Sequence, residues 1–213
     1  MNSSKITFIY IYNKPHLLER SLSYVNDLLV PEDMEVEIIK LNNQRSMCSG
    51  YNNAMKMTDA RYKVYLHQDV NILNRNFIYD LVSLFIKDSK IGVIGMCGPK
   101  RLPSRAVWWE APTKYGQIVG LKFQEPIGPY EYVDAVDGLL IATQYDVQWR
   151  EDLFRSWHMY DISQCKEFRL KGYKVAVPRQ SSGPWVEHDQ REATGSPGYD
   201  LDRELYINYY RNT

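Results

Sequence analysis

The first hundred residues alternate between short apolar runs and longer segments with helical spacing. Apolar runs rich in β-branched and aromatic residues occur at 5–12, 35–41, 62–66 and 91–97. Between them, apolar side chains recur every three or four residues, which predicts helices after Pro15, around 51–57 and from about 75 to 87. This alternation is typical of an α/β domain whose parallel strands are joined by right-handed crossovers.

The second half of the chain has a less regular pattern. Residues 100–130 are rich in proline and glycine and predict no regular element, whereas residues 133–143 predict one strand. Asp161 is expected to begin a helix that Gly172 ends. The remaining predictions are a last strand at 173–177, a mobile loop at 180–199 and a helix at about 201–209.

The ends of the predicted parallel strands carry polar residues or glycine. They are Tyr12-Asn13, Asn42-Asn43, His67-Gln68-Asp69 and Gly98-Pro99. Ligands of open α/β sheets bind outside the carboxyl ends of the strands. An imidazole and a carboxylate two residues apart are well suited to a divalent cation there. Because no GxGxxG or GxxxxGK[ST] loop is present, a bound diphosphate would need such a cation as its counter-charge.

Composition excludes several classes of protein. The 213 residues include 26 acidic and 26 basic ones, so no overall charge attracts nucleic acid, and we expect no nucleic-acid partner. Three cysteines without a CxxC pair predict free thiols in a reducing, cytoplasmic compartment. No apolar run approaches the roughly 20 residues of a membrane span, so peripheral association is the one membrane contact compatible with the sequence. The oligomeric state stays open.

Several motifs, in order, resemble a family 2 glycosyltransferase with the GT-A fold. In the first half these are the strand end at Tyr12-Asn13, the helix opening near Tyr51-Asn52-Asn53-Ala54, and VYLHQDV at 64–70. In the second half, VDGLL at 136–140 resembles the acceptor-side strand, and the segment 154–161 resembles the ED-containing segment. HQD stands where that family carries a DxD motif. This variant resembles a subgroup described as glycosyltransferase-like.

The resemblance implies a fold and an activity. The fold would be a single GT-A-like α/β domain with a mostly parallel central sheet flanked by helices. Residues 1–99 would form the nucleotide-sugar-binding half, residues 100–190 the acceptor-side half, and residues 191–213 a helical tail. The activity would be metal-dependent, inverting transfer of a sugar from a nucleotide-diphosphate donor to the hydroxyl of a carbohydrate or other acceptor. It would serve glycan or cell-surface polysaccharide assembly.

The resemblance also assigns donor-side residues. The nucleoside would lie over Tyr12, Asn13, Asn42 and Asn43, with further donor contacts from Arg45, Asn52 and Asp137. Asp69 would hold Mn²⁺ or Mg²⁺ against the diphosphate, with His188 as a further ligand and His67 as a weaker one. Asn42 and Asn43 replace an aspartate that commonly recognises uracil, so the base stays open.

On the acceptor side, Asp161 is the candidate general base. An inverting transfer needs one carboxylate to take the proton of the attacking hydroxyl. The alternative is a helix cap, and the helix dipole would favour the ionised carboxylate by about 0.3–1 kcal/mol. Trp108 or Trp109 would stack on an acceptor sugar, and because neighbours on a strand point oppositely, only one is expected to be available.

Two other functions remain open on the sequence. One is a non-catalytic GT-A module that binds a nucleotide or a glycan, which the weakened acidic motifs favour: Tyr160 stands where the family often has Glu. The other is a metal-dependent nucleotide-sugar hydrolase or nucleotidyltransferase that uses His67, Asp69 and His188. The absence of a QxxRW motif argues against synthesis of a long polymer across a bilayer.

Overall fold

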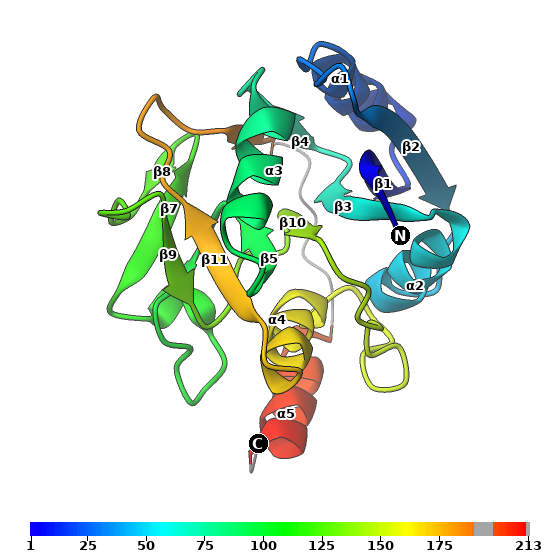
Figure 1. The fold of residues 1–213 in the computed structure, drawn as a ribbon. Coiled ribbons are helices and arrows are strands. Elements are labelled where there is room, and N and C mark those ends of the chain that lie inside the picture. Colours follow the sequence, from blue (N-terminus) through cyan, green and yellow to red (C-terminus); the bar gives the residue numbers. More distant parts are fainter. Residues whose placement is uncertain (190–197, 212–213) are drawn as a thin grey trace.

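The computed structural model describes residues 1–189 and 198–211, which form three layers with a sheet between helices (Figure 1). The seven-stranded sheet has the order β2-β1-β3-β10-β5-β11-β9. Its strands are β1 (Asn2–Tyr12), β2 (Glu35–Asn42), β3 (Ala60–His67), β5 (Ile91–Gly95), β9 (Tyr130–Val133), β10 (Leu140–Thr143) and β11 (Lys174–Pro178). The helices are α1 (Pro15–Asn26), α2 (Met47–Met57), α3 (Phe77–Lys87), α4 (Tyr160–Leu170) and α5 (Tyr199–Tyr210).

Most strands of the sheet run in one direction. The pairings of β1 with β2 and β3, and of β5 with β11, are parallel, whereas β10 and β9 are antiparallel to their neighbours. Strands β1, β2, β3, β5 and β11 therefore point the same way. The predicted α/β fold with a mostly parallel sheet is confirmed.

Alternate side chains of β1 enter two different cores. Phe8 and Tyr10 pack in the core under α1 and α3, with Leu18 of α1. Ile9 packs in the core under α2, α4 and α5, with Tyr51 of α2. All five side chains are buried, and burial of each stabilises the fold by roughly 1.5–3 kcal/mol. A strand that is covered on both faces has no polar face, which explains the continuous apolar runs of the sequence.

The segment 133–143 is not one strand, as the sequence predicted. A turn at 134–139 separates β9 from β10, and β10 enters the sheet antiparallel to both β3 and β5. The amino end of β10 consequently lies beside the carboxyl end of β3, where the backbone N–H of His67 donates to the carbonyl of Leu139 at 3.0 Å. The interruption brings Asp137 to the edge at which β3 ends.

The region 97–122 contains structure that the sequence did not predict, and the strand predicted at 91–97 ends at Gly95. β6 (Cys97–Pro99), β7 (Lys114–Ile118) and β8 (Leu121–Lys122) form a small antiparallel sheet. A single 3₁₀ turn, η1 (Trp108–Glu110), lies between β6 and β7. Each of these strands is five residues or shorter, which is too short to show a clear alternating pattern.

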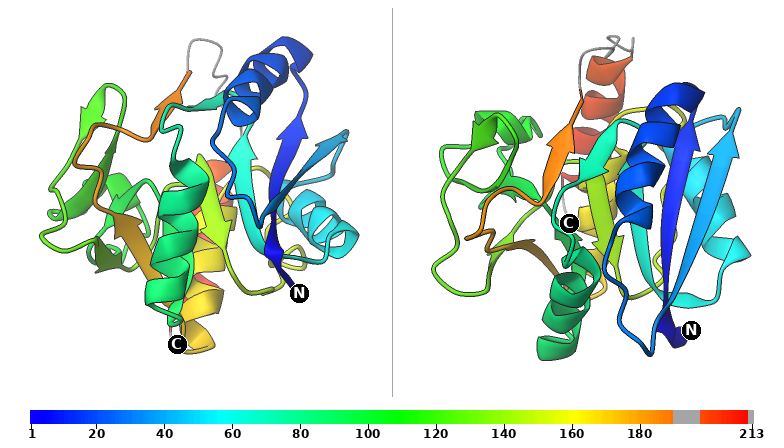
Figure 2. Two further views of the ribbon diagram at one scale, coloured as in Figure 1. Left: turned by 45° about the horizontal axis from the view of Figure 1, so that its top comes forward. Right: turned by 90° about the horizontal axis from the view of Figure 1, so that it is seen from above.

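A second small sheet pairs segments that are far apart in the sequence. β4 (Val70–Ile72), directly after the HQD motif, is antiparallel to β12 (Val186–His188), and Figure 2 shows the two strands side by side. The prediction of a mobile loop over 180–199 is therefore wrong for 186–188, which are held in a ladder. Residues 190–197 of that prediction lie outside the described residues.

The helices begin and end close to the predicted positions. α2 starts four residues earlier than expected because Ser46 caps it: Ser46 Oγ accepts from the N–H of Ser49 at 3.1 Å, and Ser49 Oγ accepts from the N–H of Ser46 at 3.3 Å. Gly172, with φ +88°, follows the end of α4 as predicted. None of the helices in the described part of the chain is long and apolar enough to cross a membrane.

Candidate active site

The predicted ligand edge of the sheet is formed by the carboxyl ends of β1, β2 and β3. Parallel pairing places Tyr12 beside Asn42 and Ile11 beside His67. Asn42 and Asn43 are exposed at this edge, and Asn43 has a positive φ of +52°, so the chain turns sharply there. Three of the four strand ends that the sequence singled out therefore lie at one edge. The fourth, Gly98-Pro99, does not end a strand of the main sheet, because it belongs to β6 of the small sheet.

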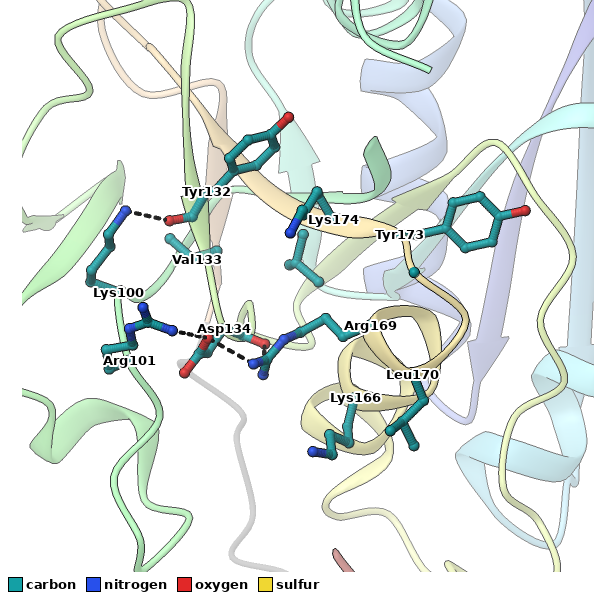
Figure 3. Close-up of a pocket in the computed structure, with 12 residues that line it drawn as sticks. Lys100, Arg101, Tyr132, Val133, Asp134, Lys166, Arg169, Leu170, Tyr173 and Lys174 are labelled. Carbon is teal, nitrogen blue, oxygen red and sulfur yellow. Dashed lines mark hydrogen bonds and ion pairs between the residues drawn. The ribbon is translucent and has the colours of Figure 1, made fainter. Parts of the chain in front are cut away.

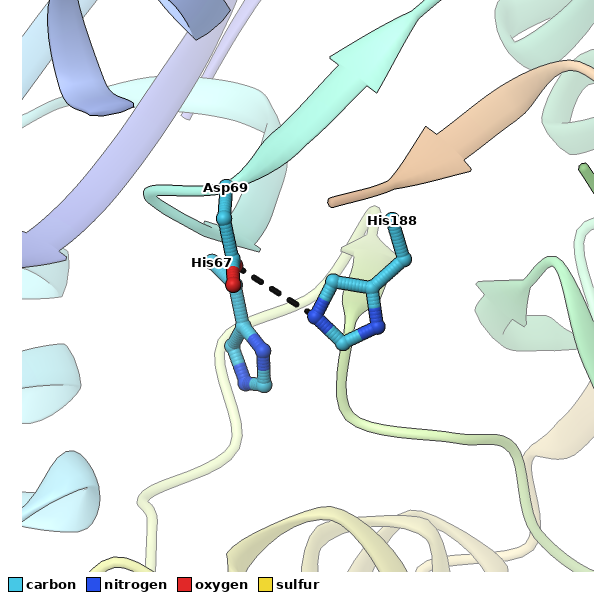
Figure 4. A group of neighbouring side chains, drawn as sticks. All are labelled: His67, Asp69 and His188. Carbon is cyan, nitrogen blue, oxygen red and sulfur yellow. Dashed lines mark ion pairs between the residues drawn. The ribbon is translucent and has the colours of Figure 1, made fainter. Parts of the chain in front are cut away.

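Three potential metal ligands meet at this edge. His67 ends β3, Asp69 lies in the turn to β4, and His188 ends β12 (Figure 4). Asp69 Oδ1 is 3.3 Å from His188 Nε2, and the ligand atoms of all three residues lie within 4.8 Å of one another. The sequence predicted these three residues as a group. The structure brings them together, and we call His67, Asp69 and His188 the ligand cluster.

His188 is held at the ligand cluster by a network that the sequence did not predict. The N–H of Asp189 donates to the carbonyl of Asp69 at 2.8 Å. Arg20 of α1 donates from Nη1 to Asp189 Oδ2 at 2.7 Å and from Nη2 to Glu187 Oε2 at 3.2 Å. Asp189 is only 8% exposed, so its carboxylate is stabilised mainly by protein groups. Helix α1 thereby fixes both neighbours of His188.

Replacing Arg20 with alanine is expected to loosen β12 and weaken cation binding at the ligand cluster. The buried carboxylate of Asp189 would lose a charged donor, which costs about 1–3 kcal/mol of unfolding free energy. Urea denaturation and Mn²⁺ titration measure the two effects. Arg179→Ala is the matched control, because Arg179 pairs with the exposed Glu125 and such pairs contribute about 1 kcal/mol or less. Equal losses in both variants would contradict the role of Arg20.

The chemistry of the ligand cluster fits a divalent cation. Burial opposes ionisation of Asp69, but the hydrogen bond and charge of His188 outweigh it and hold the pKa of Asp69 below its usual value. Burial lowers the pKa of His67, which favours the neutral imidazole that binds metals. Two imidazoles and one carboxylate suit Mn²⁺, Fe²⁺ or Zn²⁺ better than Mg²⁺, which prefers oxygen ligands.

His67 also borders a cavity of about 280 Å³ that is lined by Asp137 and Asp161 from the second half of the chain. Asp137 comes from the turn before β10, and Asp161 from the first turn of α4. One oxygen of Asp137, Oδ1, accepts from the N–H of Leu139 at 2.9 Å. The cavity therefore places a candidate base beside the candidate metal site.

Asp161 differs from expectation in its protonation. Burial, and then the nearby charge of Asp137, raise the pKa of Asp161 to about 7. This rise of about three pKa units corresponds to roughly 4 kcal/mol, which exceeds the 0.3–1 kcal/mol that a helix N-terminus supplies. An Asp161 that is fully ionised at neutral pH, which the helix dipole alone would favour, is therefore not what the structure indicates. A carboxyl with this pKa can exchange protons near neutral pH.

The outer wall of the cavity is aromatic. Trp109 is 52% exposed and Trp157 is 43% exposed, and both line the cavity, together with Tyr199 of α5. Trp108 is buried against Phe123. Trp108 nevertheless lines the cavity as well, so both adjacent tryptophans border it, and they lie on the turn η1 and not on a strand as assumed. An exposed indole beside a carboxylate suits the apolar face of a sugar.

Two of the predicted donor residues, Asn13 and Arg45, lie in different surroundings. Asn13 is held by Gln68, whose Oε1 accepts from the N–H of Asn13 at 2.9 Å and whose Nε2 donates to Asn13 Oδ1 at 2.8 Å. Arg45 is exposed but lines another recess, with Trp149 and Asp152. Neither observation assigns a donor contact, so the roles of Asn13 and Arg45 remain predictions.

Asn52 cannot contact the donor as predicted. It is fully buried in α2, and its amide binds the backbone of Trp149 twice. Nδ2 donates to the Trp149 carbonyl and Oδ1 accepts from the Trp149 N–H, both at 2.9 Å. Its side chain is therefore a structural link between α2 and the loop after β10. The donor assignment of Asn52 is corrected accordingly.

Several residues of the site were missed by the sequence analysis. Trp157 lies in the quoted segment 154–161, and its place four residues before Asp161 was the available signal. His158, which was not among the predicted site residues, also lines the cavity. For Arg20 and Tyr199 the sequence held no local signal, because their partners are distant in the chain.

A second recess, of about 410 Å³, lies at the other end of α4 (Figure 3). Arg169 Nη2 is 3.0 Å from Asp134 Oδ1, and the exposed Arg101 approaches the same carboxylate at 3.6 Å. Arg169 follows Asp161 by eight residues, or about 12 Å along the helix. These ion pairs join α4 to the chain after β9, so we regard this recess as part of the framework and not as the reaction site.

Comparison with known proteins gives one family and several related folds. Residues 7–210 match the sequence model of a glycosyltransferase-like family. No curated protein sequence matches the chain significantly. The matched range includes the ligand cluster and the cavity.

Solved structures provide similar folds. The mannosyltransferase PcManGT from Pyrobaculum calidifontis, in complex with GDP-Man and Mn²⁺, has a TM-score of 0.60 at 13% identity, over 100% of this chain and 66% of that chain. TarS 1–349 from S. aureus, in complex with UDP, has a TM-score of 0.56 at 13% identity, over 93% of this chain and 62% of that chain. The chain thus spans just under two thirds of the length of either solved chain, and TarS 1–349 is itself a part of TarS.

Proposed function

Because the chain belongs to the glycosyltransferase-like family and has its GT-A fold, we propose that it transfers a sugar from a nucleotide-diphosphate donor to an acceptor hydroxyl. The observation that supports this best is that His67 belongs both to the ligand cluster and to the wall of the cavity that Asp161 also lines. A donor on the cation and an acceptor on the base would therefore meet at one point.

On the donor side, the proposal assigns the diphosphate to the ligand cluster and the nucleoside to the edge of Tyr12, Asn42 and Asn43. Two proteins of similar fold were solved with GDP-Man and Mn²⁺, and with UDP, which supports a nucleotide donor. Asp69, His188 and His67 would hold the cation, which when bound supplies charge stabilisation for the departing diphosphate.

On the acceptor side, Asp161 would take the proton of the attacking hydroxyl. Its pKa of about 7 balances basicity against ionisation near neutral pH. Asp137, which raises that pKa, has one carboxylate oxygen that does not bind Leu139 and would accept a hydrogen bond from a substrate hydroxyl. A single base on the face opposite the leaving group implies inversion at the anomeric carbon.

The direct test is incubation with Mn²⁺ and a panel of nucleotide sugars and acceptors, with release of nucleotide diphosphate as the readout. Release that depends on the acceptor supports the proposal. Binding of the donor without release to any acceptor would favour a non-catalytic module. Release of a sugar phosphate would favour a hydrolase or nucleotidyltransferase.

Trp109→Ala and Trp157→Ala are each expected to raise the KM of a sugar acceptor with little change in kcat. Loss of one stacking partner costs roughly 0.5–1.5 kcal/mol, which corresponds to about a 2–12-fold increase. Steady-state kinetics with varied acceptor measures the effect. Tyr79→Ala, which removes an exposed aromatic ring from α3, is the control. An unchanged acceptor KM in both tryptophan variants would exclude the aromatic wall from acceptor binding.

A further inference from the structure

We propose that Tyr160 is a positioning residue that orients the ring of His67 for cation binding; the inference rests on the proposed metal site. Tyr160 is the first residue of α4, and its hydroxyl lies 2.5 Å from His67 Nε2. Among the described residues, this hydroxyl is the hydrogen-bond partner of the His67 ring. In the sequence, His67 and Tyr160 are two separate departures from the family pattern. In the structure, a hydrogen bond links their side chains.

Tyr160 is itself fixed by its surroundings. It is 5% exposed, and its ring packs with Tyr51 and Trp149 at centroid distances of 6.0 and 6.3 Å. Gly138 leaves space for the hydroxyl, because a Cβ at this position would lie 2.2 Å from Tyr160 Oη. Met159, with a φ of +57°, turns the chain sharply just before Tyr160. The hydroxyl is thus confined to the place where it meets His67.

The hydrogen bond determines which nitrogen of His67 is available. Because Nε2 faces the Tyr160 hydroxyl, Nδ1 is the nitrogen left for a cation. A neutral imidazole that binds metal through Nδ1 carries its proton on Nε2, which would then donate to the Tyr160 oxygen. The backbone N–H of His67 is also held, by the carbonyl of Leu139 at 3.0 Å. Ring and backbone are therefore both oriented before any cation arrives.

Tyr51 provides a matched control within the same aromatic cluster. Its hydroxyl is buried and has no hydrogen-bond partner in the described part of the chain. Tyr51→Phe and Tyr160→Phe each remove one buried hydroxyl from neighbouring rings, but only the second removes a bond to His67. A role of Tyr160 in packing alone would make the two variants alike.

The experiment is titration of the metal-free protein with Mn²⁺, followed by isothermal calorimetry and by the electron paramagnetic resonance signal of free Mn²⁺. Loss of a residue that orients a ligand typically weakens metal affinity by about 10–100-fold, and we expect this increase in Kd for Tyr160→Phe. Tyr51→Phe is expected to keep the wild-type Kd. In the metal-free proteins, the ¹⁵N shifts of the His67 ring should change in Tyr160→Phe and not in Tyr51→Phe.

A second variant, Gly138→Ala, tests the same hydrogen bond if Tyr160→Phe folds poorly. Gly138→Ala keeps every polar group but displaces the Tyr160 hydroxyl, and it should weaken Mn²⁺ binding in the same direction. A wild-type Kd in Tyr160→Phe, with binding that still requires Asp69, would overturn the positioning role and leave the metal site intact. Absence of Mn²⁺ binding to the wild-type protein would overturn both.

Discussion

The Asp161→Asn protein is expected to bind the donor normally and to transfer sugar about 10²–10⁴-fold more slowly than the wild type. The amide has the size of the carboxyl and can occupy the same cavity, but it cannot accept the proton of the acceptor hydroxyl. Turnover is followed as nucleotide diphosphate release, and donor affinity by calorimetry. Wild-type turnover in this variant would remove Asp161 from the role of base.

The pH dependence of turnover provides a second readout of the same group. A base must be deprotonated to act, so wild-type kcat is expected to rise with pH through about 7. Because the charge of Asp137 contributes to the raised pKa of Asp161, Asp137→Asn should move the midpoint to lower pH. The residual activity of Asp161→Asn should lack this rise. A midpoint that Asp137→Asn leaves in place would contradict the coupling between the two carboxyls.

The raised pKa of Asp161 also predicts how stability depends on pH. The folded protein keeps a proton on Asp161 up to about pH 7, whereas the unfolded chain loses it near the ordinary value of 3.8. At Asp161 the folded state therefore binds more protons between these values, and the contribution of this group to the unfolding free energy falls as pH rises from about 4 to 7. Three pKa units correspond to roughly 4 kcal/mol. Urea denaturation of wild type and Asp161→Asn should show this loss in the wild type alone.

Replacing Asp69 with asparagine is expected to abolish cation binding at the ligand cluster and with it most of the transfer activity. The variant removes the single carboxylate of the cluster. The loss of metal affinity should therefore exceed the roughly 10–100-fold loss that follows when a residue that only orients a ligand is removed. Calorimetry on protein stripped with EDTA measures the affinity. Asp134→Asn, which removes a carboxylate from the recess at the far end of α4, is the control.

The chemical identity of the ligand atoms also predicts which cation binds more tightly. Since two of the three candidate ligands are imidazoles, wild-type protein should bind Mn²⁺ more tightly than Mg²⁺. The stripped protein should recover transfer on addition of Mn²⁺. Mn²⁺ binding that is unaffected by Asp69→Asn would place the cation elsewhere, and activity that survives EDTA would exclude a metal-dependent reaction.

The parts of the fold that could be predicted are those that depend on local pattern. β1, β3 and α1 have long apolar runs or helical spacing, and their places followed from the sequence. β12 has three residues and no pattern of its own, and it exists because its partner β4 lies across from it. Pairing of segments more than a hundred residues apart depends on the whole fold.

The same distinction applies to the site. Asp69 and Asp161 stand at element ends that the sequence marked, so both could be named. The burial of Asn52 could not be foreseen, because its partner Trp149 is 97 residues away. The pKa of Asp161 depends on Asp137, which reaches the cavity only through the turn before β10. Long-range contacts of this kind determine the protonation and burial of a side chain, and the local sequence contains no pattern that predicts them.

The position of β10 has a consequence for how the chain folds during synthesis. β10 is the strand that joins the group β2-β1-β3 to the group β5-β11-β9. Until residues 140–143 leave the ribosome, the facing edges of β3 and β5 have no partner, and open strand edges are templates for aggregation. A nascent chain that ends before Leu140 therefore leaves the facing edge of β3 and both edges of β5 unpaired. The four-residue strand β10 joins the two groups, and the second edge of β5 is covered only when β11 follows.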